Sequence, residues 1–225
     1  MSIPHSGASD IPPYIQELPK YMTWDELGDL PDEVAGEIEL WDGRVVWART
    51  GSPAHQNYSV EFRNALKKRA ADEAERNTRD CWRATTETNV FLSHHHKNDF
   101  LTPDFMVYRC LPDEFEYVHH NDVALVGEVE SPSNTSTDIE HKKARYAAAG
   151  IPWYWHVQLS RHPRRVAGVT VFALLRDITE VLPGVSPLHP SNYIAIAEWN
   201  PEDDPDGIQI NLPFPIVIPW EELEY

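Results

Sequence analysis

Residues 125–154 read LVGEVESPSNTSTDIEHKKARYAAAGIPWY, and their pattern indicates a strand, a turn and a helix in succession. The strand is predicted over Val123–Val129, a short apolar run rich in β-branched residues. After a turn that contains proline, the chain is predicted to be helical, with Thr135 or Thr137 as N-cap and Gly150 just past the helix end. The stretch is therefore typical of an α/β fold.

Two acids interrupt the predicted strand. Glu128 and Glu130 lie two residues apart, so both project from one face while Val129 points to the other. A carboxylate in a buried strand is costly unless it is paired, solvated or bound to a metal, which makes this pair a candidate site. A structural salt bridge with Lys142 or Lys143, on the predicted helix, is the alternative.

The segment before residue 50 contains two local signals. Thr23 to Glu26 has the spacing of a capping box, which predicts a short helix ending near Leu30. Residues 37–47 alternate around Asp42-Gly43, a dipeptide typical of a two-residue hairpin turn. In the first arm Glu39 lies on the face opposite Ile38 and Leu40, and periodicity alone predicts a solvated position for it.

A long amphipathic helix is predicted over residues 54–76, with an apolar face that packs on a sheet. Strands are predicted over 85–92 and 101–108, and Pro103 places Asp104 near the N-terminal part of the second strand. An aromatic strand is predicted over 152–158. Further on, a hairpin is predicted from 164–175 and 179–181, irregular surface structure over 183–207, and an edge segment followed by a turn after residue 212.

Composition sets limits on the class of protein. The net charge of −17 argues against a protein that coats DNA nonspecifically, although basic residues cluster at 67–69, 142–145 and 161–165. No apolar run approaches the roughly 20 residues needed to cross a membrane, and no signal peptide is visible, so we expect a cytoplasmic location. Residues 1–21 are predicted to be a flexible tail and 22–225 a single domain. Cys81 and Cys110 are far apart in sequence, so no disulfide is expected.

Two groups of histidines invite a metal-site interpretation. His94, His95 and His96 are consecutive, as are His119 and His120, and both groups fall in polar segments. Consecutive histidines cannot all converge on one ion. We therefore favour solvated loops for both.

The predicted elements bring Asp104, Glu128 and Lys142 onto two strands and the following helix. Two carboxylates from neighbouring strands supply the hard oxygen ligands that Mg²⁺ or Mn²⁺ prefers. A bound metal and a nearby lysine are suited to hydrolysis of phosphodiester bonds. Because these residue types are common, their spacing alone is a weak signal.

A series of short motifs spans residues 22–158. Its members are Met22-Thr23-Trp24-Asp25-Glu26-Leu27, Glu39-Leu40-Trp41-Asp42-Gly43, His55-Gln56, Pro103-Asp104, Glu128-Val129-Glu130-Ser131-Pro132-Ser133, Asp138, Lys142, Tyr146, Gly150 and Tyr154-Trp155. This series resembles the Uma2 family of restriction-endonuclease-like proteins, a branch of the PD-(D/E)xK nuclease superfamily. The resemblance implies a restriction-endonuclease-like α/β core with a mixed β-sheet flanked by helices, an N-terminal β-hairpin and a C-terminal β extension.

The resemblance also implies site residues. Asp104 and Glu128 match the metal ligands, Lys142 matches a catalytic lysine on the helix, and Glu39 matches a further acid at the site. The superfamily's usual lysine stands two residues after the second acid, where this chain has Glu130. The sequence leaves open whether Glu130 is an additional ligand or points at Lys143.

His55 and Gln56 match positions that line the edge of the site. Gln158 stands where the family commonly has an acid, which departs from the pattern.

The function that follows is a Mg²⁺- or Mn²⁺-dependent endonuclease acting on DNA, and its architecture is compatible with a homodimer. Two alternatives stay open. One is a non-catalytic binding or regulatory protein with the same fold, which the acidic charge favours. The other is a phosphodiesterase acting on RNA or a small nucleotide, which needs less basic surface.

Overall fold

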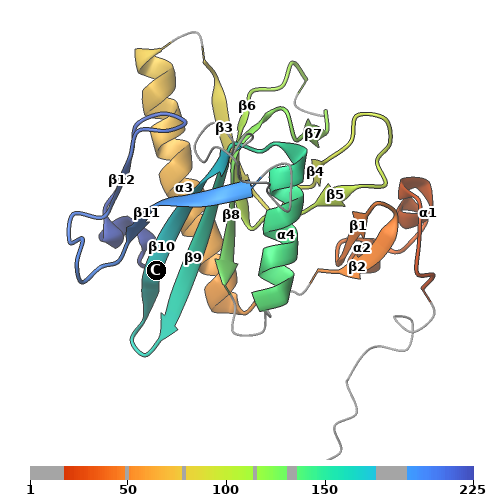
Figure 1. The fold of residues 1–225 in the computed structure, drawn as a ribbon, viewed down its shortest axis with the longest axis horizontal. Helices are drawn as coiled ribbons and strands as arrows, with labels where there is room; N and C mark the ends of the chain where they lie inside the picture. Colours follow the sequence, from red (N-terminus) through yellow and green to blue (C-terminus); the bar gives the residue numbers. More distant parts are fainter. Residues whose placement is uncertain (1–17, 49–50, 78–79, 114–115, 131–135, 176–191) are drawn as a thin grey trace, which may run out of the picture.

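The computed structural model describes residues 18–48, 51–77, 80–113, 116–130, 136–175 and 192–225, which form two main sheets and two long helices (Figure 1). The helices are α1 (Trp24–Gly28), α2 (Asp32–Ala35), α3 (Pro53–Arg76), α4 (Ser136–Ala149) and a final 3-10 helix, η3 (Trp220–Leu223). The strands are β1 (Ile38–Trp41), β2 (Arg44–Trp47), β3 (Trp82–Thr86), β4 (Val90–Phe91), β5 (Phe100–Leu101), β6 (Phe105–Arg109), β7 (Val118–His119), β8 (Val123–Glu130), β9 (Trp153–Arg161), β10 (Arg164–Leu175), β11 (Asn192–Trp199), β12 (Ile208–Ile210) and β13 (Ile216–Ile218).

The larger sheet has six strands in the order β11-β10-β9-β8-β6-β3. Strands β8 and β9 are parallel, because α4 connects them as a crossover, and the other neighbours are antiparallel. This confirms the predicted mixed sheet. The predicted strand at the centre of the sequence, the helix after it and the aromatic strand beyond are β8, α4 and β9.

The two long helices cover opposite faces of the six-stranded sheet (Figure 1). The apolar face of α3 packs on one side, where Phe62 stacks on Phe105 of β6 with ring centroids 5.1 Å apart. Tyr146 of α4 packs on the other side, against Val126 of β8 and Tyr154 of β9. Successive residues of β8 point alternately toward α3 and toward α4. Val129 therefore faces α3, on the side opposite Glu128, and the alternation had predicted these opposite faces.

The second sheet has the order β2-β1-β5-β4-β7 and includes the predicted hairpin. Asp42 and Gly43 form its turn with positive φ angles of 51° and 79°, as their sequence requires. The predicted capping box is present at the start of α1, where Thr23 and Glu26 exchange hydrogen bonds. The hairpin, α1 and α2 surround a separate apolar cluster.

Two predicted strands are each divided in the structure, and their halves belong to different sheets. Residues 85–92 break at Glu87, whose φ of 46° turns the chain from β3 into β4. Residues 101–108 break at Thr102–Asp104, because Pro103 has no N–H for a ladder. Asp104 therefore lies immediately before β6, in the short connection between the two sheets.

The prediction for residues 183–207 was wrong in part. Residues 192–199 form β11, an edge strand paired with β10, because this stretch contains no proline and its N–H groups are available for the ladder. Strand β10 pairs with β9 and β11, and the predicted partner at 179–181 lies outside the described residues. The C-terminal segment forms β12, β13 and η3, which agrees with the predicted edge segment and turn.

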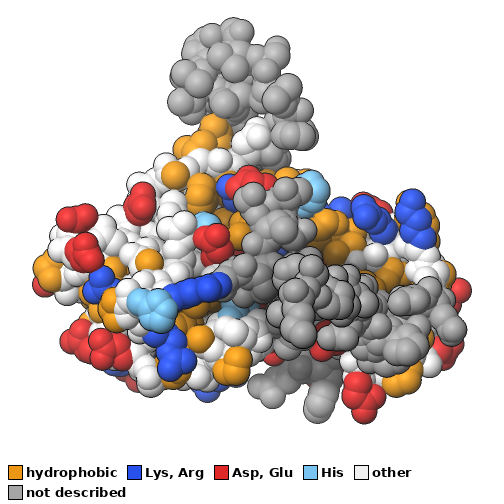
Figure 2. Space-filling model, turned by 90° about the horizontal axis from the view of Figure 1, so that it is seen from below, with side chains coloured by type: hydrophobic (Ala, Val, Ile, Leu, Met, Phe, Trp, Pro, Cys, Tyr) orange, Lys and Arg blue, Asp and Glu red, His pale blue; other side chains and the backbone are white. Residues whose placement is uncertain are grey.

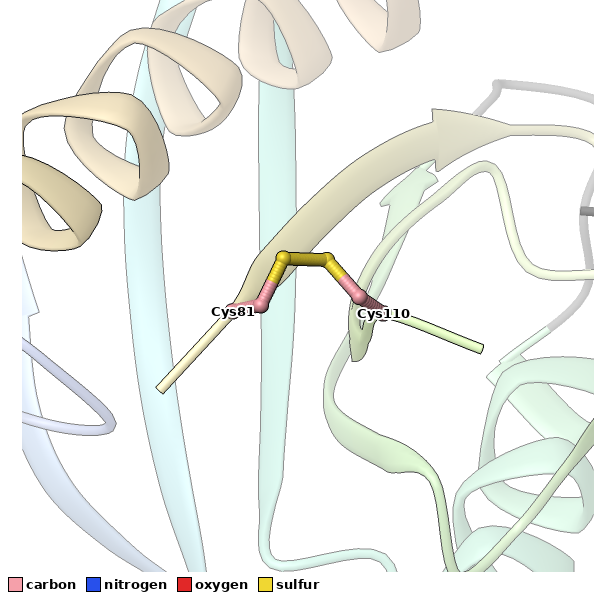
Figure 3. The surroundings of a disulfide bond; sticks show 2 residues. All are labelled: Cys81 and Cys110. Atoms are coloured by element: carbon pink, nitrogen blue, oxygen red, sulfur yellow. A yellow bond between two sulfur atoms is a disulfide. The ribbon is translucent and has the colours of Figure 1, made fainter. Parts of the chain in front are cut away.

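Cys81 and Cys110 form a disulfide (Figure 3), so the prediction that they are unpaired was wrong. The register of β3 and β6 pairs Trp82 with Arg109, and this places the two cysteines opposite each other just beyond the strand ends. Their Cα atoms are 5.3 Å apart. Separation in sequence was therefore a poor guide to separation in space.

The predicted tail, residues 1–21, lies outside the described residues except at 18–21. There Tyr21 forms a β-bridge with Arg44, and the Lys20 carbonyl accepts a hydrogen bond from Val45. Within the described part of the chain, no helix is long and apolar enough to span a membrane. Thr135, one of two predicted N-caps of α4, is also outside the described residues, whereas Thr137 lies inside the helix and is not its cap.

Candidate active site

A cavity of about 620 Å³ opens where the two sheets meet. Its walls come from the β1–β2 hairpin, α2, the first turn of α3, the connection between β5 and β6, strand β8 and helix α4. Six residues predicted from the sequence line it: Glu39, His55, Gln56, Asp104, Glu128 and Lys142. Residues spread over more than a hundred sequence positions thus converge on one cavity.

Glu39 is completely buried, although periodicity alone predicted a solvated position. Its Oε1 accepts a hydrogen bond from the Thr102 backbone N–H at 3.0 Å, and its Oε2 accepts one from the Trp41 indole at 2.9 Å. Buried carboxylates require such partners. Glu39 is therefore held in a fixed orientation on β1, which lies between β2 and β5 in the second sheet.

Asp104 is held by groups from α3 and β8. Its Oδ2 accepts a hydrogen bond from the Val129 backbone N–H at 2.6 Å and lies 3.0 Å from His55 Nε2. Burial alone would lower the pKa of His55, but the hydrogen bond and negative charge of Asp104 outweigh it and raise that pKa. Among the described residues, no hydrogen bond to the second oxygen, Oδ1, is found, and the side chain borders the cavity.

Glu128 projects from β8 toward α4, and it lies on the face opposite Val129, as the alternation predicted. Its Oε1 accepts a hydrogen bond from the Tyr146 hydroxyl at 2.7 Å. Burial raises the pKa of Glu128 to about 7, while the charge of Lys142 acts in the opposite direction and that of Asp104 adds to the rise. A cation beside Glu128 favours its ionised form, as Lys142 does.

Lys142 reaches the cavity from α4. Its Nζ lies 2.9 Å from Glu39 Oε1 and 3.3 Å from Glu128 Oε1, and it donates a hydrogen bond to the Thr102 carbonyl at 3.2 Å. Burial would lower the pKa of Lys142, but the charges of Glu128 and Glu39 outweigh it and raise that pKa. The side chain is therefore an ammonium at neutral pH.

Glu130 and Gln56 occupy different places. Glu130 does not line the cavity, and its carboxylate lies 3.4 Å from His156 Nε2 on the adjacent strand. Lys143, which was the predicted partner of Glu130, pairs instead with Glu140 at 2.7 Å. Gln56 lines the cavity and donates a hydrogen bond to Glu87 at 2.6 Å.

The oxygen donors of Asp104 and Glu128 suit a hard divalent cation. No group of three or more His, Cys, Asp or Glu side chains is arranged to hold an ion in the part of the chain that is described. Mg²⁺, however, is commonly bound through only one or two carboxylates, with waters and substrate phosphate as the other ligands. A cation beside these carboxyl groups would also favour their ionised forms, so the donor set fits Mg²⁺ or Mn²⁺.

The histidine groups lie away from this cavity. His94 stacks on His119 with ring centroids 4.8 Å apart, and its ring nitrogen lies 2.8 Å from the Asn121 amide. His120 is half-buried, and this burial lowers its pKa. His95 and His96 are exposed, which agrees with the predicted polar loop, whereas His119 belongs to β7.

Three contact residues of the site, Tyr146, Thr102 and Trp41, were not predicted as site residues, although Tyr146 and Trp41 belong to the motif series that resembles the family. Tyr146 follows Lys142 by one helical turn, so both face the same side of α4. That spacing was a usable signal. Thr102 contributes through backbone atoms, and no side-chain pattern reveals such a role.

Comparison with solved structures gives an independent view of the fold. The chain is similar to the crystal structure of a putative nuclease belonging to DUF820 from Anabaena variabilis, with a TM-score of 0.54 and 15% sequence identity. The match covers 90% of this chain and 97% of the other. At this identity the likeness establishes the fold. No significant match to a curated protein was found.

The sequence model of the Uma2 family, described as a putative restriction endonuclease, matches residues 24–195. The match includes all the residues that converge on the cavity, and the resemblance expected from the motifs is confirmed. The chain therefore belongs to the Uma2 family.

Proposed function

We propose that this protein is a metal-dependent nuclease that hydrolyses phosphodiester bonds of DNA. The convergence of Asp104, Glu128 and Lys142 in one cavity carries the proposal. A cavity lined with carboxylates and one ammonium suits a phosphate ester together with a divalent cation. The family description and the description of the Anabaena protein support the same class of activity.

Each residue has a role in this proposal. Asp104 and Glu128 would hold Mg²⁺ or Mn²⁺, which when bound activates a water molecule and offsets charge on the phosphate. Lys142, as an ammonium, orients Glu128 and Glu39 and donates to a phosphate oxygen as negative charge develops there. Glu39 keeps the Lys142 side chain extended into the cavity. His55 orients the Asp104 carboxylate.

Three broader expectations stay predictions. They are a cytoplasmic location, a homodimer, and a single domain over residues 22–225. The Cys81–Cys110 disulfide bears on the first, because disulfides are rare in reducing compartments. Trapping of free thiols in intact cells would therefore test the location and the disulfide together.

Cleavage assays test the proposed activity. Supercoiled plasmid, single-stranded DNA and RNA are incubated with Mg²⁺ or Mn²⁺ and with wild type, Asp104→Asn or Lys142→Met. Lys143→Met is the matched control, because Lys143 pairs with the exposed Glu140 outside the cavity. We expect metal-dependent cleavage by wild type and the control, and a loss of at least a hundredfold in the other two. Equal cleavage by all four proteins would contradict the assignment. Absence of cleavage by folded wild type would favour the non-catalytic alternative.

A further inference from the structure

We propose that the substrate is an unpaired nucleic-acid strand, and that the site does not act on phosphates within an intact duplex. The inference rests on the proposed nuclease function and specifies its substrate class. Four features of the described residues carry it: the depth of the reactive groups, the size of the cavity, the pairing of the basic side chains, and the aromatic wall of the cavity.

The reactive groups lie below the molecular surface. The exposed fraction of the side chain is 1% for Glu39, 7% for Glu128 and 15% for Asp104. Duplex DNA is stiff over about 150 base pairs, and bending a short site costs on the order of 1–6 kcal/mol. A single strand is flexible and can bring one phosphate into a recess. The depth of the site therefore favours an unpaired strand.

The cavity has dimensions suited to a small part of a strand. Its volume of about 620 Å³ lies within the range of pockets that enclose small-molecule ligands, roughly 300–1,000 Å³. The hairpin contributes Trp41, Val46 and Trp47 to the wall, and α2 contributes Ala35. A nucleotide with its phosphate fits such a space, whereas a duplex would have to remain outside these walls.

The basic residues predicted to offset the negative charge are mostly engaged in ion pairs. The pairs are Lys68 and Arg69 with Glu222, Lys143 with Glu140, Arg145 with Asp42 and Asp99, and Arg165 with Glu202. On the face shown in Figure 2, basic side chains stand in small groups with acidic side chains between them. Proteins that hold duplex DNA by its backbone use several Lys and Arg side chains to neutralise its phosphates, and these side chains are free of acidic partners. The described surface is better suited to a ligand that presents few phosphates at once.

The cavity wall supplies aromatic surface for stacking. Trp41 is fixed by the hydrogen bond from its indole to Glu39, and the Arg145 guanidinium lies 5.4 Å from its ring centroid. Trp47 lines the same cavity from the other arm of the hairpin. Unpaired bases stack on aromatic side chains whatever their sequence, whereas bases in a duplex are already stacked on each other. The two tryptophans therefore favour the same class of substrate as the depth of the site.

Binding and cleavage of matched oligonucleotides test the inference. One labelled sequence is prepared as a single strand, as a blunt duplex and as a duplex with an unpaired tail. Affinity is measured by fluorescence anisotropy with Asp104→Asn, and cleavage is measured with wild type. We expect the single strand to bind at least tenfold more tightly than the blunt duplex, and cuts in the tailed substrate to fall in the tail.

A pair of tryptophan variants connects this preference to the cavity. Trp47→Leu should weaken single-strand binding about tenfold, as expected for loss of one stacked base. Trp82→Leu is the control, because Trp82 is also half-buried in an edge strand but lies outside the cavity.

Equal affinity for the single strand and the blunt duplex, or equal effects of the two tryptophan variants, would overturn the inference. Cleavage of duplex alone, lost in Asp104→Asn, would overturn it and leave the nuclease proposal standing. No cleavage, with tight single-strand binding that depends on Trp47, would support this substrate class and count against the nuclease.

Discussion

The Nζ atom of Lys142 lies 2.9 Å from Oε1 of Glu39, and this contact joins helix α4 to strand β1 of the other sheet. The Glu39 side chain is 1% exposed and that of Lys142 is 20% exposed, so water screens the pair weakly. The same ammonium lies 3.3 Å from Glu128. One cation thus neutralises acids from both sheets.

Replacement of Lys142 by methionine should therefore affect stability as well as activity. The change leaves Glu39 and Glu128 buried without their cation, and breaking a buried pair in this way costs about 3–5 kcal/mol. Urea unfolding followed by circular dichroism measures the loss. Lys143→Met should change stability by about 1 kcal/mol or less, because it loses only the pair with the exposed Glu140 and the contact of its ammonium with the Phe172 ring, 4.5 Å from the centroid. Similar losses in the two variants would contradict a special position for Lys142.

The raised pKa of Glu128 predicts that the free energy of unfolding depends on pH. Burial raises this pKa from 4.5 to about 7, so the folded state binds a proton more readily than the unfolded state between these values. Wild-type stability should accordingly fall as pH rises through this window, relative to Glu128→Gln, which cannot ionise. In a chelator, the excess stability of Glu128→Gln should increase from pH 5 to pH 7 and then level off. Glu140→Gln, on the exposed face of α4, serves as the control, and the same pH trend in both variants would refute the prediction.

A methyl group at Gly51 should displace His55. A Cβ atom built at Gly51 would lie 2.0 Å from His55 Nδ1, so the imidazole could not keep its contact with Asp104. We expect Gly51→Ala to reduce cleavage at least tenfold with little loss of secondary structure. Gly28→Ala is the matched control, since no heavy atom lies within 4 Å of a Cβ there. Unchanged cleavage in Gly51→Ala would show that the His55 contact is dispensable.

Loss of the disulfide should lower stability. Cys81 and Cys110 are 29 residues apart, and closing a loop of this length is worth about 3–4 kcal/mol in the chain-entropy description. Reducing agent should therefore lower the urea midpoint of wild type. It should not affect the Cys81→Ser, Cys110→Ser double variant, whose midpoint should match that of the reduced wild type. An unchanged wild-type midpoint after complete reduction would contradict this.

Periodicity and local signals predicted the longer elements well. Helix α3 has its apolar face where the 3.6-residue pattern placed it, because that face packs on a sheet over many turns. Strand β8, helix α4 and strand β9 also follow their patterns. The positive φ of Gly150 agrees with its predicted place beyond the end of α4.

Features that depend on strand pairing could not be predicted in this way. The strands β4, β5 and β7 have two residues each, which is too short for a pattern to appear. Cys81 and Cys110 meet only because β3 and β6 are neighbours. The buried Glu39 is paired with Lys142 from α4, a helix that packs on the larger sheet, and alternation within one strand contains no information about that partner.

The site residues came from the sequence by two routes. Asp104, Glu128 and Lys142 were first singled out by chemistry and placement, and Glu39, His55 and Gln56 by resemblance to the family. All six line the cavity. Glu130 does not line the cavity. Alternation places it on the same face as Glu128, but it does not show that the cavity ends before this residue of β8.

The way α4 completes the carboxylate cluster has a consequence for the protein as it is being made. Glu39, Asp104 and Glu128 precede Lys142 in the sequence, and in the folded protein the Lys142 ammonium contacts both Glu39 and Glu128. A chain that ends before α4 lacks this ammonium, so it also lacks the ion pairs that connect β1 with β8 at the cavity.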